Sequence, residues 1–179
     1  MIIQFCGLSG AGKTTLALAV KRLAEKKGIA VEVIDGDKYR KTLCKDLGFS
    51  KEDRFENLRR LTKVAAECSK KGMVAIISAI HPYREVRQGL KKLYPGRIKT
   101  VFVDCPLQVL MHRDTKGLYK RALLPDGDPD KLPNLTGVGD TFEKPLNPDL
   151  HLHTDLNSIK ESSEELLEFI LQQKELNGQ

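Results

Sequence analysis

The chain has 179 residues, of which 40% are hydrophobic and 30% charged, and its formal net charge is +6. This composition is typical of one globular domain with its own core, and no apolar run approaches the roughly 18–20 residues of a membrane span, so we expect no membrane partner. The basic residues are spread along the chain and are not interleaved with aromatic ones, which indicates nucleotide phosphate rather than nucleic acid as the partner.

A glycine-rich pattern follows the first predicted strand. Residues 7–14 read G-L-S-G-A-G-K-T and fit the P-loop pattern G-x-x-x-x-G-K-[S/T]. Glycines let the backbone curl so that its N–H groups point at phosphate oxygens, and the N-terminus of the next helix adds its positive dipole end. The alternative is a glycine-rich turn that binds nothing, which the strand before it and the helix after it disfavour.

The P-loop residues receive separate roles. Lys13 would reach the β- and γ-phosphates of a nucleoside triphosphate, and the Thr14 hydroxyl would take one position on Mg²⁺. The residues expected to bind the triphosphate here are Gly7, Ser9, Gly10, Ala11, Gly12, Lys13, Thr14 and Thr15.

Strands and helices alternate along the rest of the chain. The predicted strands cover residues 1–6, 30–34, 73–78, 98–104 and 150–154. The predicted helices cover residues 15–23, 38–43, 51–71 and 83–93, then one with Pro106 in its first turn and one opened by Ser158. The apolar run before Ser78 is typical of a strand buried on both faces. This order predicts an α/β fold, a doubly wound parallel sheet of the P-loop NTPase type with helices on both faces.

The last third of the chain contains a segment of different character. Residues 114–148 are rich in Gly, Pro, Asp and Lys with little periodicity, which predicts a mobile lid and not core. Ser158-x-x-Glu161 predicts a capping box that opens the closing helix. The residues expected to face inward from that helix are Ile159, Leu166, Leu167, Ile170 and Leu171. We find no internal repeat and expect one domain over residues 1–179, with the lid inside it.

The acids that follow the second strand favour a small-molecule kinase. The chain lacks the guanine-reading N-K-x-D of GTPases, and the strand ending at Ser78 carries no acid at the usual Walker B place. Asp35 and Asp37 would face the γ-phosphate from the acceptor side, where a carboxylate can hold Mg²⁺ through water and take a proton from an attacking hydroxyl. The alternatives are a helix N-cap for Asp37 and a turn for Asp35. Asp104 resembles a Walker B acid, but a turn residue before Pro106 is favoured.

The cysteines and the first residues bear on the cellular compartment. Cys6, Cys44, Cys68 and Cys105 are scattered, with no C-x-x-C pair and no histidine at metal-site spacing. We expect reduced, structural thiols in a cytoplasmic protein. No basic leader precedes the first strand, so we expect no signal peptide.

Further motifs, in order and at matching spacing, make the chain resemble the adenylylsulfate kinases (APS kinases), a P-loop kinase family. The likeness runs from Phe5 to about Leu167. Besides the P-loop, the matching motifs are D-G-D-x-x-R at 35–40, D-L-G-F-S-x-x-D-R-x-E-N-x-R-R at 46–60, the end of I-S-P-Y-R at 82–84, R-D-x-K-G-L-Y-K at 113–120 and D-L-x-L-x-T-D at 149–155.

The resemblance implies transfer of the γ-phosphoryl group of ATP to the 3′-hydroxyl of adenylyl sulfate, giving 3′-phosphoadenylyl sulfate and ADP in sulfate assimilation. It implies Mg²⁺ as cofactor, held by Thr14 and, partly through water, by Asp35, with Lys13 and Asp35 catalytic. Arg113 and Asn157 would contact ATP. The residues implied to bind the substrate are Asp37, Arg40, Phe49, Arg54, Asn57, Ile80, His81, Lys116 and Leu135.

These substrate residues suit the ligand chemically. Arg40 and Arg54 can fork onto phosphate and sulfate oxygens, and the Phe49 ring can stack on adenine. Lys116 would close over the phosphates and exclude water. For Arg54 and Asn57 the alternative is a helix face with solvated charges.

Two departures from the family pattern fall on the acceptor side. His81 replaces the serine of I-S-P-Y-R, so no phosphoserine can form there, and we expect His81 to serve the loop or to offer its backbone; Ser78, within a strand, should not inherit that role. Leu135 replaces an aromatic residue of the lid, which weakens stacking on adenine by about 1 kcal/mol.

These departures leave two alternatives open. One is a kinase of the same fold acting on another nucleotide-linked or sugar substrate, and the other is a non-catalytic NTP-binding module. A homodimer and a functional association with a sulfate adenylyltransferase are further partners that stay open.

Overall fold

Five strands form one parallel sheet at the centre of the chain, in the order β2-β3-β1-β4-β5. All four neighbouring pairs run parallel. The computed structural model describes residues 1–176 and residue 178. The strands are β1 Ile2–Cys6, β2 Val31–Asp35, β3 Val74–Ser78, β4 Ile98–Asp104 and β5 Leu150–His153. The predicted α/β fold with a doubly wound parallel sheet is therefore confirmed.

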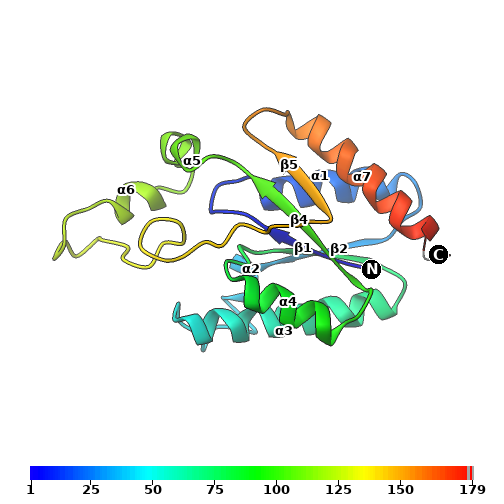
Figure 1. The fold of residues 1–179 in the computed structure, drawn as a ribbon, viewed down its shortest axis with the longest axis horizontal. Coiled ribbons are helices and arrows are strands. Elements are labelled where there is room, and N and C mark those ends of the chain that lie inside the picture. Colours follow the sequence, from blue (N-terminus) through cyan, green and yellow to red (C-terminus); the bar gives the residue numbers. More distant parts are fainter. Residues whose placement is uncertain (177, 179) are drawn as a thin grey trace.

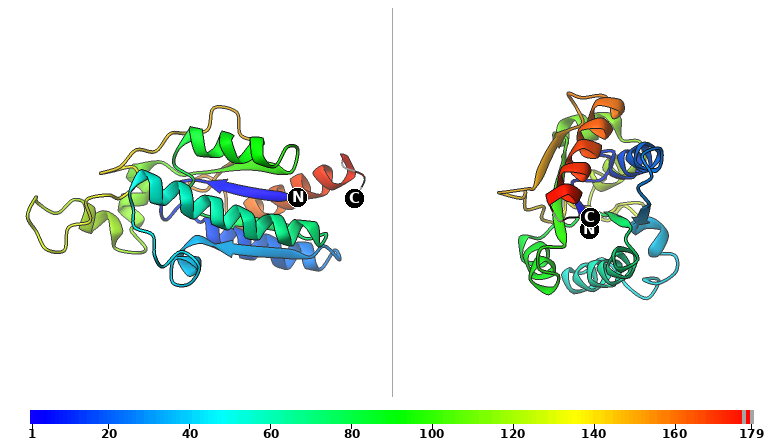
Figure 2. Two further views of the ribbon diagram at one scale, coloured as in Figure 1. Left: turned by 90° about the horizontal axis from the view of Figure 1, so that it is seen from below. Right: turned by 90° about the vertical axis from the view of Figure 1, so that its right-hand side faces the viewer.

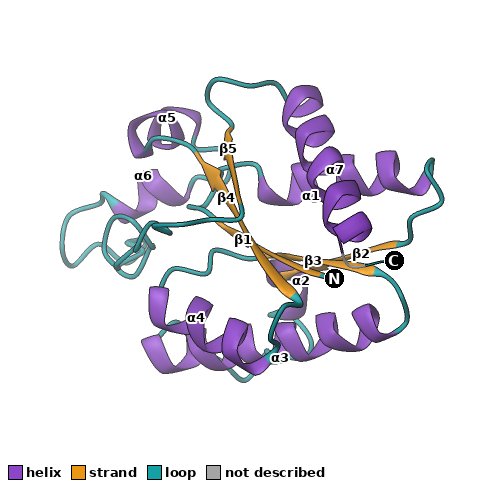
Figure 3. Cartoon of the chain, turned by 45° about the vertical axis from the view of Figure 1, so that its right-hand side comes forward, coloured by secondary structure: helices purple, strands orange, loops and turns teal. Residues whose placement is uncertain are grey.

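Helices cover both faces of this sheet. They are α1 Lys13–Glu25, α2 Gly36–Tyr39, α3 Lys51–Lys70, α4 Arg84–Leu93, α5 Leu107–Arg113, α6 Leu118–Ala122 and α7 Ile159–Leu176. Figures 1 and 3 show α1 and α7 on one face and α3 and α4 on the other. Within residues 1–176, no helix combines the length and the apolar character that crossing a membrane requires.

Each face of the sheet builds its own hydrophobic core. Ile3 and Phe5 of β1 pack toward α1 and α7, whereas Ile2 packs toward α3 and α4. All residues of β1 and β3 are buried, as their continuous apolar runs predict for strands covered on both sides. Burial of each such side chain contributes about 1.5–3 kcal/mol, so these two strands hold the carboxyl edge of the sheet firmly in place.

The structure differs from the predicted elements at several places, of which three bear on the site. The short helix after β2 begins at Gly36, not at residue 38, because the Asp35 carboxylate caps it. Pro106 lies at the N-cap of α5, one place before the first turn. A short helix, α6, lies inside the predicted lid.

The expectation that the lid segment contributes nothing to the core is wrong. Tyr119 and Leu135 are 2% and 7% exposed and join the core on the α1 and α7 side. Single apolar side chains anchor a segment whose average composition is polar. The segment extends beyond the end of the sheet (Figure 2, left), and its movement as a lid stays a prediction.

The closing helix begins as predicted, but not every residue that was expected to face inward is buried. Ser158 N donates to Glu161 Oε2 at 2.8 Å, and Glu161 N donates to Ser158 Oγ at 3.2 Å, which completes the capping box. Leu166, Leu167 and Ile170 are buried, but Ile159 is 58% exposed. Ile159 opens the first turn of α7 on its exposed side, whereas Ser162 and Ser163, three and four residues later, are already buried.

Candidate active site

The P-loop curls between β1 and α1 at the carboxyl edge of the sheet. Gly10 and Gly12 have φ values of 76° and 88°, a left-handed conformation that favours glycine. At Gly7, an added Cβ would lie 2.3 Å from the Val103 carbonyl oxygen, so any side chain would clash with β4. The glycines of the motif are therefore required by the backbone path and by its close approach to β4.

Lys13 is the cation of the P-loop and lies almost fully buried. Its Nζ donates to the carbonyl oxygens of Gly7 at 3.0 Å and Leu8 at 2.6 Å, and the residue is 9% exposed. Burial, and then the charge of Lys116, lower the pKa of Lys13 to about 8. The structure therefore confines a strong donor inside the loop, with little water to compete for it.

A cluster of oxygen atoms lies beside Lys13. Thr14 Oγ1 donates to Asp35 Oδ2 at 2.8 Å and lies 2.9 Å from Ser78 Oγ. Carboxylate and hydroxyl oxygens are the ligands that Mg²⁺ prefers, so these residues suit the predicted metal. Ser78 was not foreseen as part of this cluster; the signal available was its place at the end of β3, directly opposite Asp35 in the parallel pairing.

Asp35 also holds the backbone at the start of α2. Its Oδ1 accepts from Asp37 N at 2.9 Å and from Lys38 N at 3.1 Å. Asp35 is thus the N-cap, and the alternative that gave this role to Asp37 is wrong. The Asp37 carboxylate instead lies 2.6 Å from Lys116 Nζ, and this hydrogen bond holds the pKa of Asp37 below its usual range.

Two guanidinium groups surround an exposed aromatic ring on the other side of this edge. The Phe49 side chain is 55% exposed, with Arg40 4.4 Å and Arg54 5.6 Å from its ring centroid. Arg40 Nη1 also donates to the Gly48 carbonyl at 2.9 Å. The alternative in which Arg54 and Asn57 are solvated is wrong, because they are only 7% and 5% exposed.

Arg54 ties the lid segment to α3. It donates to Thr136 Oγ1 at 3.1 Å and to the Asn134 carbonyl at 2.8 Å, and its Nε lies 3.1 Å from Asp140 Oδ2. Tyr83 adds a hydrogen bond from its hydroxyl to Asp140 at 3.0 Å. Asn57 Oδ1 is buried and has no hydrogen-bond partner among the residues the structure describes, which leaves a polar atom for a ligand in this part of the molecule.

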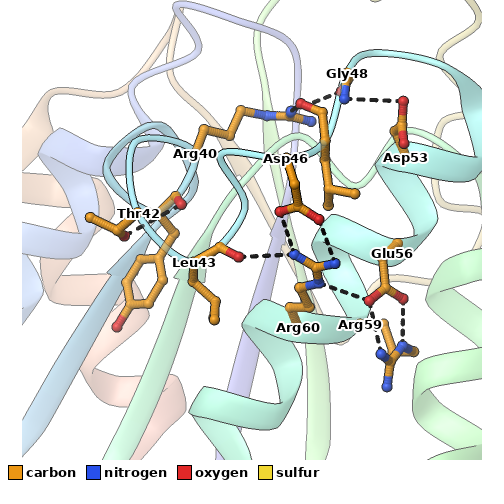
Figure 4. Close-up of polar contacts among 11 residues, drawn as sticks. Arg40, Thr42, Leu43, Asp46, Gly48, Asp53, Glu56, Arg59 and Arg60 are labelled. Carbon is orange, nitrogen blue, oxygen red and sulfur yellow. Dashed lines mark hydrogen bonds and ion pairs between the residues drawn. The ribbon is translucent and has the colours of Figure 1, made fainter.

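An ion network fixes the loop that carries Phe49 (Figure 4). Arg60 donates two hydrogen bonds to Asp46, at 2.7 and 2.8 Å, one to Glu56 and one to the Leu43 carbonyl. Glu56 also accepts from Arg59, and the hydrogen bonds from Arg59 and Arg60 hold the pKa of Glu56 at about 2. The loop between α2 and α3 is therefore fastened to α3 at its base.

Two residues that the sequence did not point to as functional form hydrogen bonds with the P-loop backbone. Tyr119 of α6 donates its hydroxyl to the Ser9 carbonyl at 2.8 Å, and Thr154 Oγ1 donates to the Ala11 carbonyl at 3.0 Å. Both lie within motifs of the resemblance, K-G-L-Y-K and T-D, which was the only signal for them. Arg113 lies near the same place and donates to the Thr154 carbonyl at 3.3 Å. Asn157 N donates to the His153 carbonyl at 2.9 Å, just after β5.

The two residues that depart from the family pattern are both buried. His81 is fully buried with φ 49°, burial lowers its pKa to about 4, and its carbonyl accepts from Arg87 Nη1 at 2.6 Å. The neighbouring Ile80 carbonyl accepts from Gly7 N at 3.2 Å. Leu135 is 7% exposed within the core. In this conformation the side chains of His81 and Leu135 therefore fill the protein and are not offered to a ligand.

Comparisons with known proteins agree on one family. The model of the family described as adenylylsulphate kinase matches residues 1–153. The adenylyl-sulfate kinase of Chloroflexus aurantiacus is 47% identical over 93% of this chain and 87% of its own, and that of Deinococcus deserti is 44% identical over 94% and 90%. The structure of the Mycobacterium tuberculosis APS kinase CysC in complex with AMPPNP and APS has a TM-score of 0.86, with 39% identity over 94% of this chain and 96% of that one.

With the P-loop, the acids after β2 and the paired arginines on one edge of the sheet, this chain belongs to the adenylylsulphate kinase family and is an enzyme that transfers a phosphoryl group to a hydroxyl acceptor.

Proposed function

We propose that this chain transfers the γ-phosphoryl group of ATP to the 3′-hydroxyl of adenylyl sulfate and that the residues assembled at the carboxyl edge of the sheet carry out this transfer. The observation that carries the proposal is the Asp35 carboxylate, 2.8 Å from the Thr14 hydroxyl at the end of the P-loop. A carboxylate beside the γ-phosphate position can serve a hydroxyl acceptor, which a pure nucleotide-binding module does not need.

On the donor side, Lys13 and the P-loop backbone bind the β- and γ-phosphates. Thr14 and, through water, Asp35 would hold Mg²⁺, which would neutralise charge that develops on the phosphate oxygens. Ser78 orients the Thr14 hydroxyl from 2.9 Å. Arg113 is the last residue of α5 and Asn157 follows β5, where the nucleoside half of ATP would extend from the P-loop.

On the acceptor side, Phe49 stacks on the adenine of adenylyl sulfate, and Arg40 and Arg54 bind its phosphate and sulfate oxygens. Asn57 contributes its unpaired amide oxygen. Arg54 would then exchange some of its contacts with the lid for contacts with the substrate. Because those lid contacts include Asp140 at 3.1 Å, substrate and lid would compete for the same guanidinium.

The transfer itself needs one proton acceptor and no covalent intermediate. Asp35 takes the proton of the 3′-hydroxyl as the hydroxyl oxygen attacks the γ-phosphorus. The bond from that phosphorus to the β,γ-bridging oxygen breaks, which releases ADP. Lys116, paired with Asp37 at 2.6 Å, closes the 114–148 lid over the phosphates and excludes water. The fully buried His81 supports the loop and takes no part in the transfer.

The alternative of another nucleotide-linked or sugar acceptor rested on His81 and Leu135. Both side chains are buried, so neither contributes to the exposed surface around Phe49. No observation on the acceptor side favours a different substrate. The homodimer and the association with a sulfate adenylyltransferase stay open, and the cytoplasmic location stays a prediction from the scattered cysteines.

The test is ADP release measured with adenylyl sulfate against a panel of acceptors that includes AMP, a nucleoside and a sugar acid, each with ATP and Mg²⁺. We expect turnover with adenylyl sulfate far above the ATP-only background, and 3′-phosphoadenylyl sulfate as the product by mass spectrometry. Higher kcat/KM with any other acceptor, or no ADP above background at any Mg²⁺ level, would overturn the assignment of the acceptor.

The kcat/KM for ATP is expected to fall as pH rises through about 8. Burial lowers the pKa of Lys13 to about 8, so above that pH the free enzyme loses the ammonium that binds the phosphates. The kcat at saturating ATP should stay level to higher pH, because bound phosphate stabilises the charged form. Steady-state kinetics between pH 6.5 and 9.5 check this; a kcat/KM that is level to pH 9.5 would contradict it.

Arg60→Ala is expected to raise the KM for adenylyl sulfate by roughly three- to tenfold, with little change in kcat, because small displacements of positioning groups weaken binding. The change removes the bonds from Arg60 to Asp46 and to the Leu43 carbonyl that fasten the Phe49 loop. Arg59→Ala is the matched control, because Arg59 also binds Glu56 but makes no hydrogen bond or ion pair with that loop in the part of the chain that the structure describes. Equal KM values for both variants would show that the loop does not depend on Arg60.

A further inference from the structure

Three side chains with metal-binding atoms meet at the edge of the sheet, away from the Thr14 and Asp35 cluster. In the parallel pairing of β4 and β5, Asp104 lies opposite His153, and Phe102 lies opposite His151. Side chains alternate along a strand, so these four residues share one face of the sheet. One ligand atom from each of Asp104, His151 and His153 lies within 4.8 Å of the other two.

The central residue of this group, His151, is held in place. Its Nε2 lies 3.1 Å from Asp104 Oδ2, and its ring stacks on Phe102 at 4.7 Å between centroids. The centroids of the His153 and His151 rings lie 4.1 Å apart. The side chain of Asp104 is only 16% exposed, whereas that of His151 is 40% exposed. The Asp104 carboxylate is thus the more buried ligand of the group, and the two imidazoles are exposed, so that an ion can reach them from solvent.

We propose that Asp104, His151 and His153 form a binding site for one divalent transition-metal ion of the zinc class. Two imidazoles and a carboxylate are ligands for Zn²⁺, Cu²⁺ or Ni²⁺ rather than for Mg²⁺, which prefers oxygen. A tetrahedral ion with bonds of about 2.0–2.2 Å needs ligand atoms roughly 3.3–3.6 Å apart. Rotation of the exposed His153 imidazole would bring its nitrogen closer to the other two ligand atoms, which are held in place, and water would complete the fourth position.

A plain ion pair accounts for only part of the arrangement. Lys144 Nζ lies 3.7 Å from Asp104 Oδ1, and with His151 it could neutralise this carboxylate without any metal. That explanation gives His153 no role, although it contributes the third ligand atom of the group. The Lys144 side chain is 66% exposed, so an arriving cation can displace it at little cost.

A bound ion would fasten the edge strand near the nucleotide site. β5 is the last strand of the sheet, and the residue after it, Thr154, donates to the Ala11 carbonyl of the P-loop at 3.0 Å. Because the ion would bind only the folded arrangement of β4 and β5, it should stabilise the protein as its concentration exceeds the Kd. Acid should release it, since ligand histidines must be neutral.

The test uses the full chain without a polyhistidine tag, stripped with EDTA and titrated with ZnCl₂ by calorimetry in the absence of nucleotide and Mg²⁺. We expect one ion per chain, with a Kd in the micromolar range and a rise in Tm on Zn²⁺ addition. His153→Gln should weaken binding at least tenfold and abolish the Tm shift. His112→Gln, at an exposed histidine of α5, is the matched control and should change neither value.

Two further measurements keep the result unambiguous. Circular dichroism of His153→Gln without metal should match the parent, and His151→Gln should weaken binding equally if either variant proves unstable. Co²⁺ in place of Zn²⁺ should give the absorption of nitrogen and oxygen ligands without a thiolate band, because none of the three proposed ligands is a cysteine. Binding that H153Q and H151Q leave unchanged, a thiolate band, or no binding below about 100 µM would overturn the proposal.

Discussion

Asp35→Asn is expected to lower kcat by about 10²- to 10⁴-fold, the range that a positioned general base contributes. The substitution removes the charge that, in the proposed mechanism, accepts the proton of the 3′-hydroxyl and helps to hold Mg²⁺. Asparagine keeps a side-chain oxygen, so it can still accept from the N–H groups of Asp37 and Lys38 and cap α2. The loss should therefore appear in turnover and not in folding.

The measurement is steady-state ADP release together with thermal unfolding. Glu32→Gln is the matched control, because it removes a carboxylate from the same strand at a half-buried position that pairs only loosely with Lys21, at 3.8 Å. This control variant should have the same kcat and Tm as the parent, within experimental error. Turnover of Asp35→Asn close to that of the parent would refute Asp35 as the base.

Lys13→Met is expected to lower kcat/KM for ATP by at least about 10²- to 10³-fold, the loss typical for one preorganised donor that faces transition-state charge. The variant should unfold at the same temperature as the parent or higher. Burial lowers the pKa of Lys13 to about 8, so the folded state holds the ammonium at a cost near neutral pH, which the methionine removes.

That combination of lost activity and retained stability separates a functional lysine from a structural one. Lys21→Met on the same helix is the control, since Lys21 makes two loose ion pairs, with Glu25 and with Glu32, each at 3.8 Å, and lies away from the loop. It should leave kcat/KM unchanged. A Lys13→Met protein that loses its fold along with its activity would instead mean that the bonds from Nζ to the Gly7 and Leu8 carbonyls are what the loop requires.

The sequence by itself determined the elements whose signals are local. Both boundaries of the strand Ile98–Asp104 were predicted correctly, and those of α3 were predicted to within one residue. Apolar periodicity and capping chemistry act over three to five neighbours, so the chain alone carries them. The P-loop belongs to the same class, because its glycines serve the φ values and the close approach found at Gly7 and Gly12.

Only the tertiary structure decided which distant residues meet. Ser78 joins Thr14 from another strand, Tyr119 and Thr154 brace the P-loop from far along the chain, and no motif forecasts these distances. The exposure of Ile159 likewise depends on where α7 lies relative to the sheet, which a helical period cannot state.

The same limit applies to the histidines at the sheet edge. No motif marked them as metal ligands, because the third ligand, Asp104, lies on a different strand. The parallel register of β4 and β5 alone brings it opposite His153. Local sequence chemistry thus determined the strands, the helix caps and the phosphate-binding loop. The packing of elements that are distant in the sequence determined which side chains meet.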